Sequence, residues 1–129
     1  MLNLGTSADI YLKEGDEFLN KNDLVQASEK YYKAAEEAIK ILAIILRLKY
    51  IEKEVSKEGW NTRILNDAVF LISEKIDEKI PIYWASALSL ITVNLSKEVI
   101  EDLKKDIEEL VKIADREYNA ILEGRGRIP

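Results

Sequence analysis

The sequence predicts an all-α fold, an up-and-down antiparallel bundle of about five helices. Along most of the 129 residues, apolar side chains recur every three or four positions, which is the spacing of one helix face. Alternation with a period of two never lasts more than a few residues, so no strand is predicted. Five glycines and two prolines are too few turn formers for a β-sandwich, and the length suits one domain over residues 1–129.

The first two helices are expected to form an antiparallel hairpin over residues 6–57. Thr6 followed three positions later by Asp9 resembles a capping box, which starts the first helix. Asp23 is a second start signal and follows a short polar turn. The apolar spacing then continues without Pro or Gly as far as Gly59, so the sequence predicts a long second helix.

Three further helices are expected, each after its own start signal. They cover residues 62–80, 81–95 and 96–123, and are followed by a frayed tail at 124–129. Asn61 or Thr62 can cap the first of these helices, and Pro81 would end it because proline has no amide hydrogen and clashes with the preceding turn. Pro81 also suits the first turn of the next helix. Ser96 caps the last helix, whose apolar stripe is clean, and Gly124 stops it.

The residue inventory excludes several kinds of active site. The chain has no Cys and no His, so disulfides, thiolate nucleophiles, Ser–His triads and the usual zinc, di-iron and haem ligands are ruled out. The adjacent carboxylates Asp16/Glu17 and Glu36/Glu37 are expected to be solvated helix surface, with an oxygen-only Mg²⁺ site as the alternative. The sequence therefore predicts no cofactor and no catalytic, cofactor-binding or metal-ligating residue.

Composition and charge indicate a cytoplasmic protein. The first residues lack the basic segment and apolar run of a signal peptide, and the most apolar stretch, residues 38–48, is too short and too charged to span a bilayer. Abundant Lys, Glu and Ile without Cys is typical of thermophilic proteins. The net charge of −5 argues against a broad phosphate-binding surface. No membrane contact is expected, and contact with an anionic partner would need a local patch.

An interface is expected near the end of the long second helix. Beyond Ala38 this helix is apolar on most faces, so several of its sides must be covered by later helices or by another subunit. Ile41 and Ile45 are the candidate interface residues there. Trp60, in a Gly-Trp-Asn corner between helices, is either a plug at a helix end or a third interface residue. A homodimer is the expected assembly.

A basic stretch surrounds the connection between the second and third predicted helices. Its members are Arg47, Lys49, Lys53, Lys57 and Arg63. On an acidic protein, such a cluster is the best candidate patch for an anionic partner. The competing interpretation is a neutral surface, because Glu52, Glu54 and Glu58 are interleaved with the basic residues.

Three aromatic residues allow both a structural and a functional interpretation. Tyr31 and Tyr32 could stack on a base. Because Tyr31 lies on the apolar stripe of its helix, we expect it in the core with its hydroxyl at the edge. Trp84 is likewise expected to be a core anchor.

The first hairpin also carries a family resemblance. Its residues in order are Ala8, Leu12, Phe18, Leu19, Asp23, Ala27, the run Tyr31-Tyr32-Lys33-Ala34-Ala35-Glu36-Glu37-Ala38-Ile39-Lys40, and Leu42. This segment resembles the first helical hairpin of HEPN domains, the higher-eukaryote and prokaryote nucleotide-binding fold. More narrowly, the whole chain, with Trp84-Ala85-Ser86-Ala87-Leu88 and the amphipathic last helix, resembles the archaeal PaREP paralogous family, which is HEPN-like.

The resemblance implies a bundle of about five helices that often pairs as a homodimer. Catalytically active HEPN domains are ribonucleases with an Arg, a polar residue and, a few positions on, a His on a later helix. Arg63 is the only arginine near a suitable helix start, and no His follows it. The resemblance therefore implies a protein that is not an enzyme and that binds a nucleotide, an RNA or a nucleotidyltransferase-like partner protein.

The hairpin also resembles one tetratricopeptide unit, with Asn22-Asp23 at the turn and Ala27, Tyr31 and Ala34 in the pattern. Two features depart from that repeat: the second helix is predicted to run past the usual end of the unit, and no second copy follows. A peptide-binding adaptor is therefore the alternative function.

Overall fold

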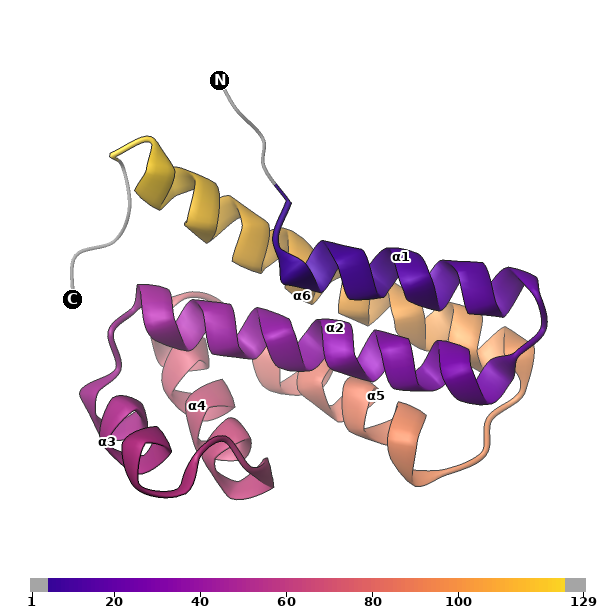
Figure 1. Cartoon of the computed structure of the whole chain (residues 1–129), viewed down its shortest axis with the longest axis horizontal. Coiled ribbons are helices and arrows are strands. Elements are labelled where there is room, and N and C mark those ends of the chain that lie inside the picture. Colours follow the sequence, from indigo (N-terminus) through magenta and orange to yellow (C-terminus); the bar gives the residue numbers. More distant parts are fainter. Residues whose placement is uncertain (1–4, 125–129) are drawn as a thin grey trace.

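The computed structural model describes residues 5–124, which form helices joined by short connections and contain no strand in that range (Figure 1). The helices are α1 (Ser7–Asn20), α2 (Leu24–Ile45), α3 (Lys49–Glu58), α4 (Thr62–Lys75), α5 (Ile80–Thr92) and α6 (Lys97–Leu122). This arrangement confirms the predicted all-α bundle, with one helix more than expected. Between residues 5 and 124, no helix has the length and apolar character needed to cross a bilayer.

Helices α1 and α2 form the predicted hairpin, and both start signals are confirmed. The carboxylate of Asp9 accepts a hydrogen bond from the backbone N–H of Thr6 at 2.7 Å. The carboxylate of Asp23 accepts one from the backbone N–H of Gln26 at 3.2 Å. Asn22, at φ 60°, provides the left-handed residue that ends α1 and reverses the chain.

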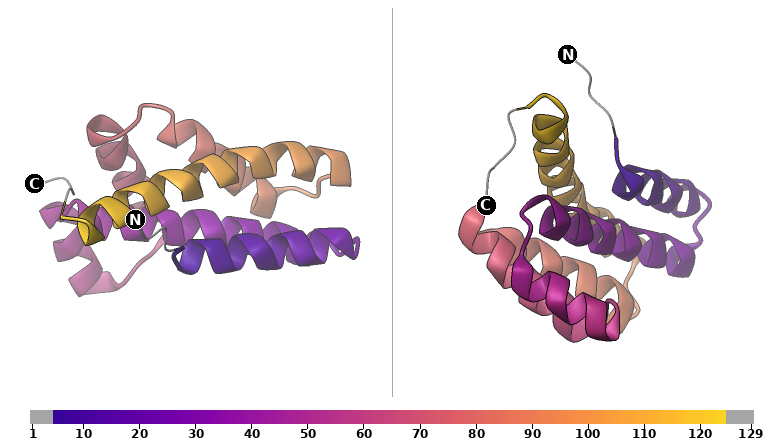
Figure 2. Two further views of the ribbon diagram at one scale, coloured as in Figure 1. Left: turned by 90° about the horizontal axis from the view of Figure 1, so that it is seen from above. Right: turned by 60° about the vertical axis from the view of Figure 1, so that its left-hand side comes forward.

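Helix α2 is the centre of the bundle. It contacts α1 and α6 on one side and α4 and α5 on the other (Figures 1 and 2). Its fully buried alanines let the neighbouring helices approach closely: Ala27, Ala34, Ala35 and Ala38. Larger side chains such as Leu42, together with Ile107 and Leu110 of α6, fill the remaining core volume. The core therefore lies along α2 rather than between separate layers.

The prediction of an uninterrupted second helix to residue 57 is wrong. Helix α2 ends at Ile45, and Arg47 adopts a left-handed conformation with φ 52°. The backbone N–H of Leu48 donates to the carbonyl of Ala43 at 3.3 Å, and that of Arg47 donates to the carbonyl of Ile44 at 3.1 Å. These two bonds define a Schellman motif, the usual way to end a helix at glycine, here formed with arginine.

Burial explains why the chain turns at Arg47. The turn leaves Leu46, Leu48 and Ile51 only 4%, 7% and 2% exposed and lays α3 against α4. Each such side chain contributes about 1.5–3 kcal/mol when fully buried. A left-handed residue other than glycine costs about 1–2 kcal/mol. The gain exceeds the cost, so the helix breaks without the Gly or Pro that would have predicted it.

The later helices follow the predicted order with shorter bounds. The caps of α4 and α6 are confirmed, since Asn61 accepts from the N–H of Ile64 at 2.9 Å and Ser96 from that of Val99 at 3.3 Å. Pro81 does not end α4, which stops at Lys75; proline instead lies in the first turn of α5, as also predicted. Of the predicted frayed tail 124–129, residues 125–129 lie outside the described range.

Candidate interaction surface

An open apolar groove lies where α2 and α6 end and α1 begins. Figure 1 shows the C-terminal half of α6 extending past the start of α1 at this end of the bundle. The groove has a volume of about 980 Å³. Its lining residues are Gly5, Thr6, Ser7, Asp9, Ile10, Ile41, Ile44, Ile45, Arg47, Tyr118 and Ile121.

Large apolar side chains stand exposed around this groove. Ile10 is 62% exposed, Ile44 is 65% exposed and Ile121 is 42% exposed. Ile41 and Ile45, the residues predicted for the interface, are half-buried and lie in the same groove. A set of aliphatic side chains gathered from three helices is typical of a surface that meets a partner.

Trp60, the third predicted interface residue, lies beside a smaller depression of about 270 Å³. That depression is also lined by Ile44 and Val55, so Ile44 stands between the two hollows. The Lys40 ammonium lies 5.8 Å from the centre of the Trp60 ring. We call the continuous apolar area the Ile44 surface. It comprises Ile10, Ile41, Ile44, Ile45, Trp60, Tyr118 and Ile121.

Sequence reasoning missed several members of the Ile44 surface. Ile10, Tyr118 and Ile121 fit the apolar stripes of their helices, a pattern that by itself indicates core positions. In the structure they lie in the first turn of α1 and the last turns of α6, where the stripes run beyond the packed core. The sequence signal that could have revealed Tyr118 and Ile121 is the apolar stripe of the last helix, which continues to the end of that long helix.

Asp9 of α1 and Asp115 of α6 form a carboxyl pair beside the groove, and Thr6 binds to both of them. The Thr6 hydroxyl donates to the carboxylate of Asp115 at 3.0 Å, while the Thr6 N–H is bound by Asp9. Burial, followed by the interaction with Asp9, raises the pKa of Asp115 to about 7. The pair fixes one wall of the groove and keeps a proton near neutral pH.

The basic stretch does not form a single free patch. Arg63 pairs with Glu54 at 3.0 Å and with Glu58 at 2.8 Å, and its pKa is raised chiefly by the hydrogen bond to Glu54. Lys57 lies 3.9 Å from Glu54. Arg47 lies on the rim of the groove, apart from this cluster. The exposed Lys49 and Lys53 form no ion pair with any residue between 5 and 124.

The aromatic residues lie where the structural interpretation placed them. Tyr31 is fully buried, and its hydroxyl donates to Asp16, which also accepts a 2.9 Å hydrogen bond from Lys104. Trp84 is 3% exposed and donates its indole N–H to Asn66 at 2.7 Å. The Tyr32 ring lies 5.7 Å from that of Trp84. Tyr31 and Trp84 are core residues, so neither offers a face to a base.

The acidic residues of the described range form no candidate metal site. Glu36 pairs with Lys40 at 2.8 Å on α2, and both side chains are about three-quarters buried, so this acid is less solvated than expected. Within the described part of the chain, no three acidic side chains converge in a way that could hold a metal ion. The groove and the Ile44 surface are therefore the candidate site.

Comparisons with known proteins place the chain among archaeal proteins. A crystal structure of a Sulfolobus solfataricus protein is similar over 88% of this chain and 97% of its own, with 43% identity and a TM-score of 0.84. A solution structure of the same target covers 89% of this chain and 93% of its own, with 41% identity and a TM-score of 0.78. No curated protein matches. The model of the archaeal PaREP1/PaREP8 family matches residues 4–111, and the chain belongs to this family.

Proposed function

We propose that this protein is a non-catalytic, HEPN-like helical module that acts by binding, and that it pairs as a homodimer through the Ile44 surface. The observation that carries the proposal is the gathering of exposed isoleucines from the ends of three helices around one groove. Monomeric proteins rarely leave such a contiguous apolar area uncovered.

The apolar contribution of this surface is large enough to support association. Ile10, Ile44 and Ile121 together expose the equivalent of nearly two isoleucine side chains. Burying them contributes roughly 3 kcal/mol per copy. In a two-fold dimer both copies bury these side chains, so the contribution doubles. Burial of the remaining exposed area of Ile41 and Ile45 adds to it. Isoleucine also loses little side-chain freedom on burial, about 0.5–1 kcal/mol, which favours it as a contact residue.

The surface has the features of a patch that fits a second copy of itself. It carries protruding side chains, such as Ile44, next to a hollow, as a two-fold interface requires. Its rim holds both a positive residue, Arg47, and a negative one, Asp9. A two-fold axis through the patch can therefore set opposite charges against each other.

Protein binding is better supported than RNA binding. The net charge is −5, and two of the five basic candidates, Lys57 and Arg63, are held by acids. Phosphate recognition needs several unneutralised basic side chains on one face. A nucleotide, an RNA or a nucleotidyltransferase-like protein is still implied by the HEPN resemblance. Lys49 and Lys53 would be its contacts.

Light scattering on size-exclusion fractions tests the pairing, using two matched variants. Ile44→Glu places a charge on the Ile44 surface, and Val25→Glu places one on an equally exposed site near the other end of α2, 68% exposed against 65%. Both variants are expected to fold because neither site is buried. We expect Ile44→Glu to be monomeric and Val25→Glu to remain dimeric. A monomeric wild-type protein would overturn the homodimer and favour the adaptor, whereas a dimeric Ile44→Glu would overturn pairing through the Ile44 surface and place the interface elsewhere.

A further inference from the structure

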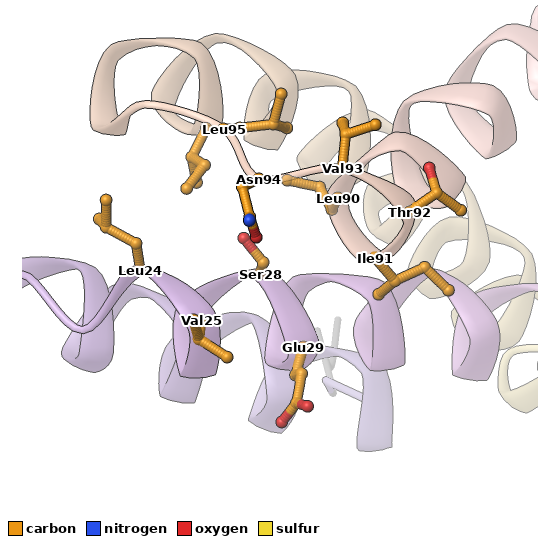
Figure 3. Close-up of a pocket in the computed structure, with 11 residues that line it drawn as sticks. Leu24, Val25, Ser28, Glu29, Leu90, Ile91, Thr92, Val93, Asn94 and Leu95 are labelled. Carbon is orange, nitrogen blue, oxygen red and sulfur yellow. The ribbon is translucent and has the colours of Figure 1, made fainter.

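A second, smaller pocket lies at the other end of the bundle, between the first turns of α2 and the connection from α5 to α6. It has a volume of about 450 Å³, within the range of small-molecule sites, about 300–1,000 Å³. Leucine, isoleucine and valine dominate its wall (Figure 3). The lining residues are Leu24, Val25, Ser28, Glu29, Leu90, Ile91, Thr92, Val93, Asn94, Leu95 and Ile100.

Two uncharged polar groups face each other across this pocket. Figure 3 shows the hydroxyl of Ser28 and the side-chain amide of Asn94 pointing toward one another. Ser28 is only 8% exposed. Asn94 is exposed at the mouth of the pocket, and neither side chain forms a hydrogen bond with any residue between 5 and 124. A hydroxyl as buried as that of Ser28 is normally paired.

Ser28 departs from the behaviour of the other helical hydroxyls nearby. A serine or threonine inside a helix can donate to the carbonyl four residues earlier. Ser89 does so to Ala85 at 3.1 Å, and Thr92 to Leu88 at 2.9 Å. Ser28 instead holds its hydroxyl toward the pocket, where it can both donate and accept.

We propose that this pocket binds a small molecule with a short aliphatic chain and an uncharged hydrogen-bonding head, such as a primary alcohol or a primary amide. The aliphatic chain packs against Leu24, Leu90 and Ile100. The head group forms hydrogen bonds with the Ser28 hydroxyl and the Asn94 side-chain amide, so that both polar groups gain a partner.

The charges around the pocket favour an uncharged head group. Glu29 is the only charged residue of the lining, and Figure 3 shows its carboxylate turned away from Ser28 and Asn94. Lys97, close by in the sequence, donates to Asn22 at 2.8 Å. A carboxylate or ammonium head would therefore lose its hydration without meeting a counter-ion, which is costly in an apolar pocket.

The pocket is separate from the Ile44 surface. Ser28 and Ile44 are both on α2 and sixteen residues apart, which places them about 24 Å from each other along the helix axis. Ligand binding in this pocket therefore does not depend on the proposed dimer, and an experiment can disprove one of the two proposals without affecting the other.

NMR titration of the ¹⁵N-labelled full chain with 1-hexanol and hexanamide tests the proposal. We expect saturable shifts confined to the amides of the lining residues, and weaker binding of hexanoate and hexylammonium. Ser28→Ala removes the polar contact with little change in packing, and should weaken hexanol roughly 2- to 10-fold, the effect of one neutral hydrogen bond. Ser89→Ala is the matched control and should bind as the wild type does, because Ser89 does not line the pocket.

Four results would overturn the proposal. The first is an absence of saturable shifts at the lining residues for both uncharged probes. The second is equal affinity of hexanol for the wild type and Ser28→Ala in spectra that show both to be folded. The third is tighter binding of hexanoate or hexylammonium than of hexanol. Shifts centred on the Ile44 surface would assign the probe to that groove and also count against this pocket.

Discussion

Gly15 of α1 lies directly against the ring of Tyr31 on α2, so close that a Cβ at residue 15 would stand 2.6 Å from two ring carbons. Because glycine has no Cβ, it allows α1 and α2 to pack this closely at residue 15. The tyrosine cannot move aside, because its ring is fully buried and its hydroxyl is bound to Asp16. A glycine that looks unfavourable in a helix is therefore required by packing.

Gly15→Ala should destabilise the protein even though alanine is the better helix former. Alanine gains about 1 kcal/mol in helix propensity. Overpacking of a core contact typically costs about 1–3 kcal/mol. The rigid ring puts this site at the upper end of that range, so we expect a net loss of about 1–2 kcal/mol in urea unfolding. Glu17→Ala, at an exposed site on the same helix, is the control and should change stability little. An unchanged or raised urea midpoint for Gly15→Ala would show that the hairpin can widen freely.

The half-buried carboxyl of Asp115 predicts a specific pH dependence of stability. Its pKa is raised from 3.8 to about 7 by burial and by Asp9. Between about pH 4 and pH 7 the folded protein keeps this proton while the unfolded chain loses it. The free energy of unfolding should therefore fall as the pH rises through this window and level off above it.

Asp115→Asn is the variant that isolates this effect. Asparagine is neutral at every pH and can still accept the hydrogen bond from Thr6. We expect thermal unfolding of Asp115→Asn to lose most of the decline between pH 4 and pH 7 and to be more stable than the wild type at pH 7. The control is Asp102→Asn on the exposed face of α6, where the side chain is 79% exposed. If the thermal unfolding midpoint of the wild type did not decline between pH 4 and pH 7, Asp115 would not keep its proton in the folded protein.

The left-handed residue that ends α2 makes a third prediction. Arg47→Gly removes the steric cost of φ 52° but adds freedom to the unfolded chain. The net effect should be a gain of about 0.5–1 kcal/mol in the free energy of unfolding. Lys49→Gly, two positions on and inside the first turn of α3, should instead lose a similar amount, because that residue is helical. A loss of stability in Arg47→Gly would show that the arginine side chain contributes more than its conformation costs.

The helix starts could be predicted because they depend on local chemistry. Asp23 and Ser96 cap the helices that the sequence assigned to them, and of the two cap candidates Asn61 and Thr62 the structure uses Asn61. The break at Arg47 could not be predicted in this way, because arginine is not a turn former. It arises from the burial of Leu48 and other side chains that become neighbours only when α3 packs on α4.

The candidate surface could be predicted only in part, because its apolar residues are visible in the sequence and the packing that leaves them open is not. The excess of apolar residues late in α2 directed attention to Ile41 and Ile45, and both line the groove, while their part in an interface stays a prediction. Ile44 is more exposed than either, but a helix that is apolar on most faces does not reveal which face its neighbours leave open. That face is set by the direction in which α6 runs past the start of α1, a tertiary property. Whether Trp60 takes part in pairing stays a prediction.

Native mass spectrometry of the wild-type protein, purified without denaturation, tests the homodimer most directly, because it reports the number of subunits and any retained ligand together. Pairing through the Ile44 surface predicts a species of two chains for the wild type and a species of one chain for Ile44→Glu. A wild-type protein that remains a single chain across micromolar concentrations would contradict pairing through the Ile44 surface. A dimer that survives the Ile44→Glu substitution would place the interface elsewhere.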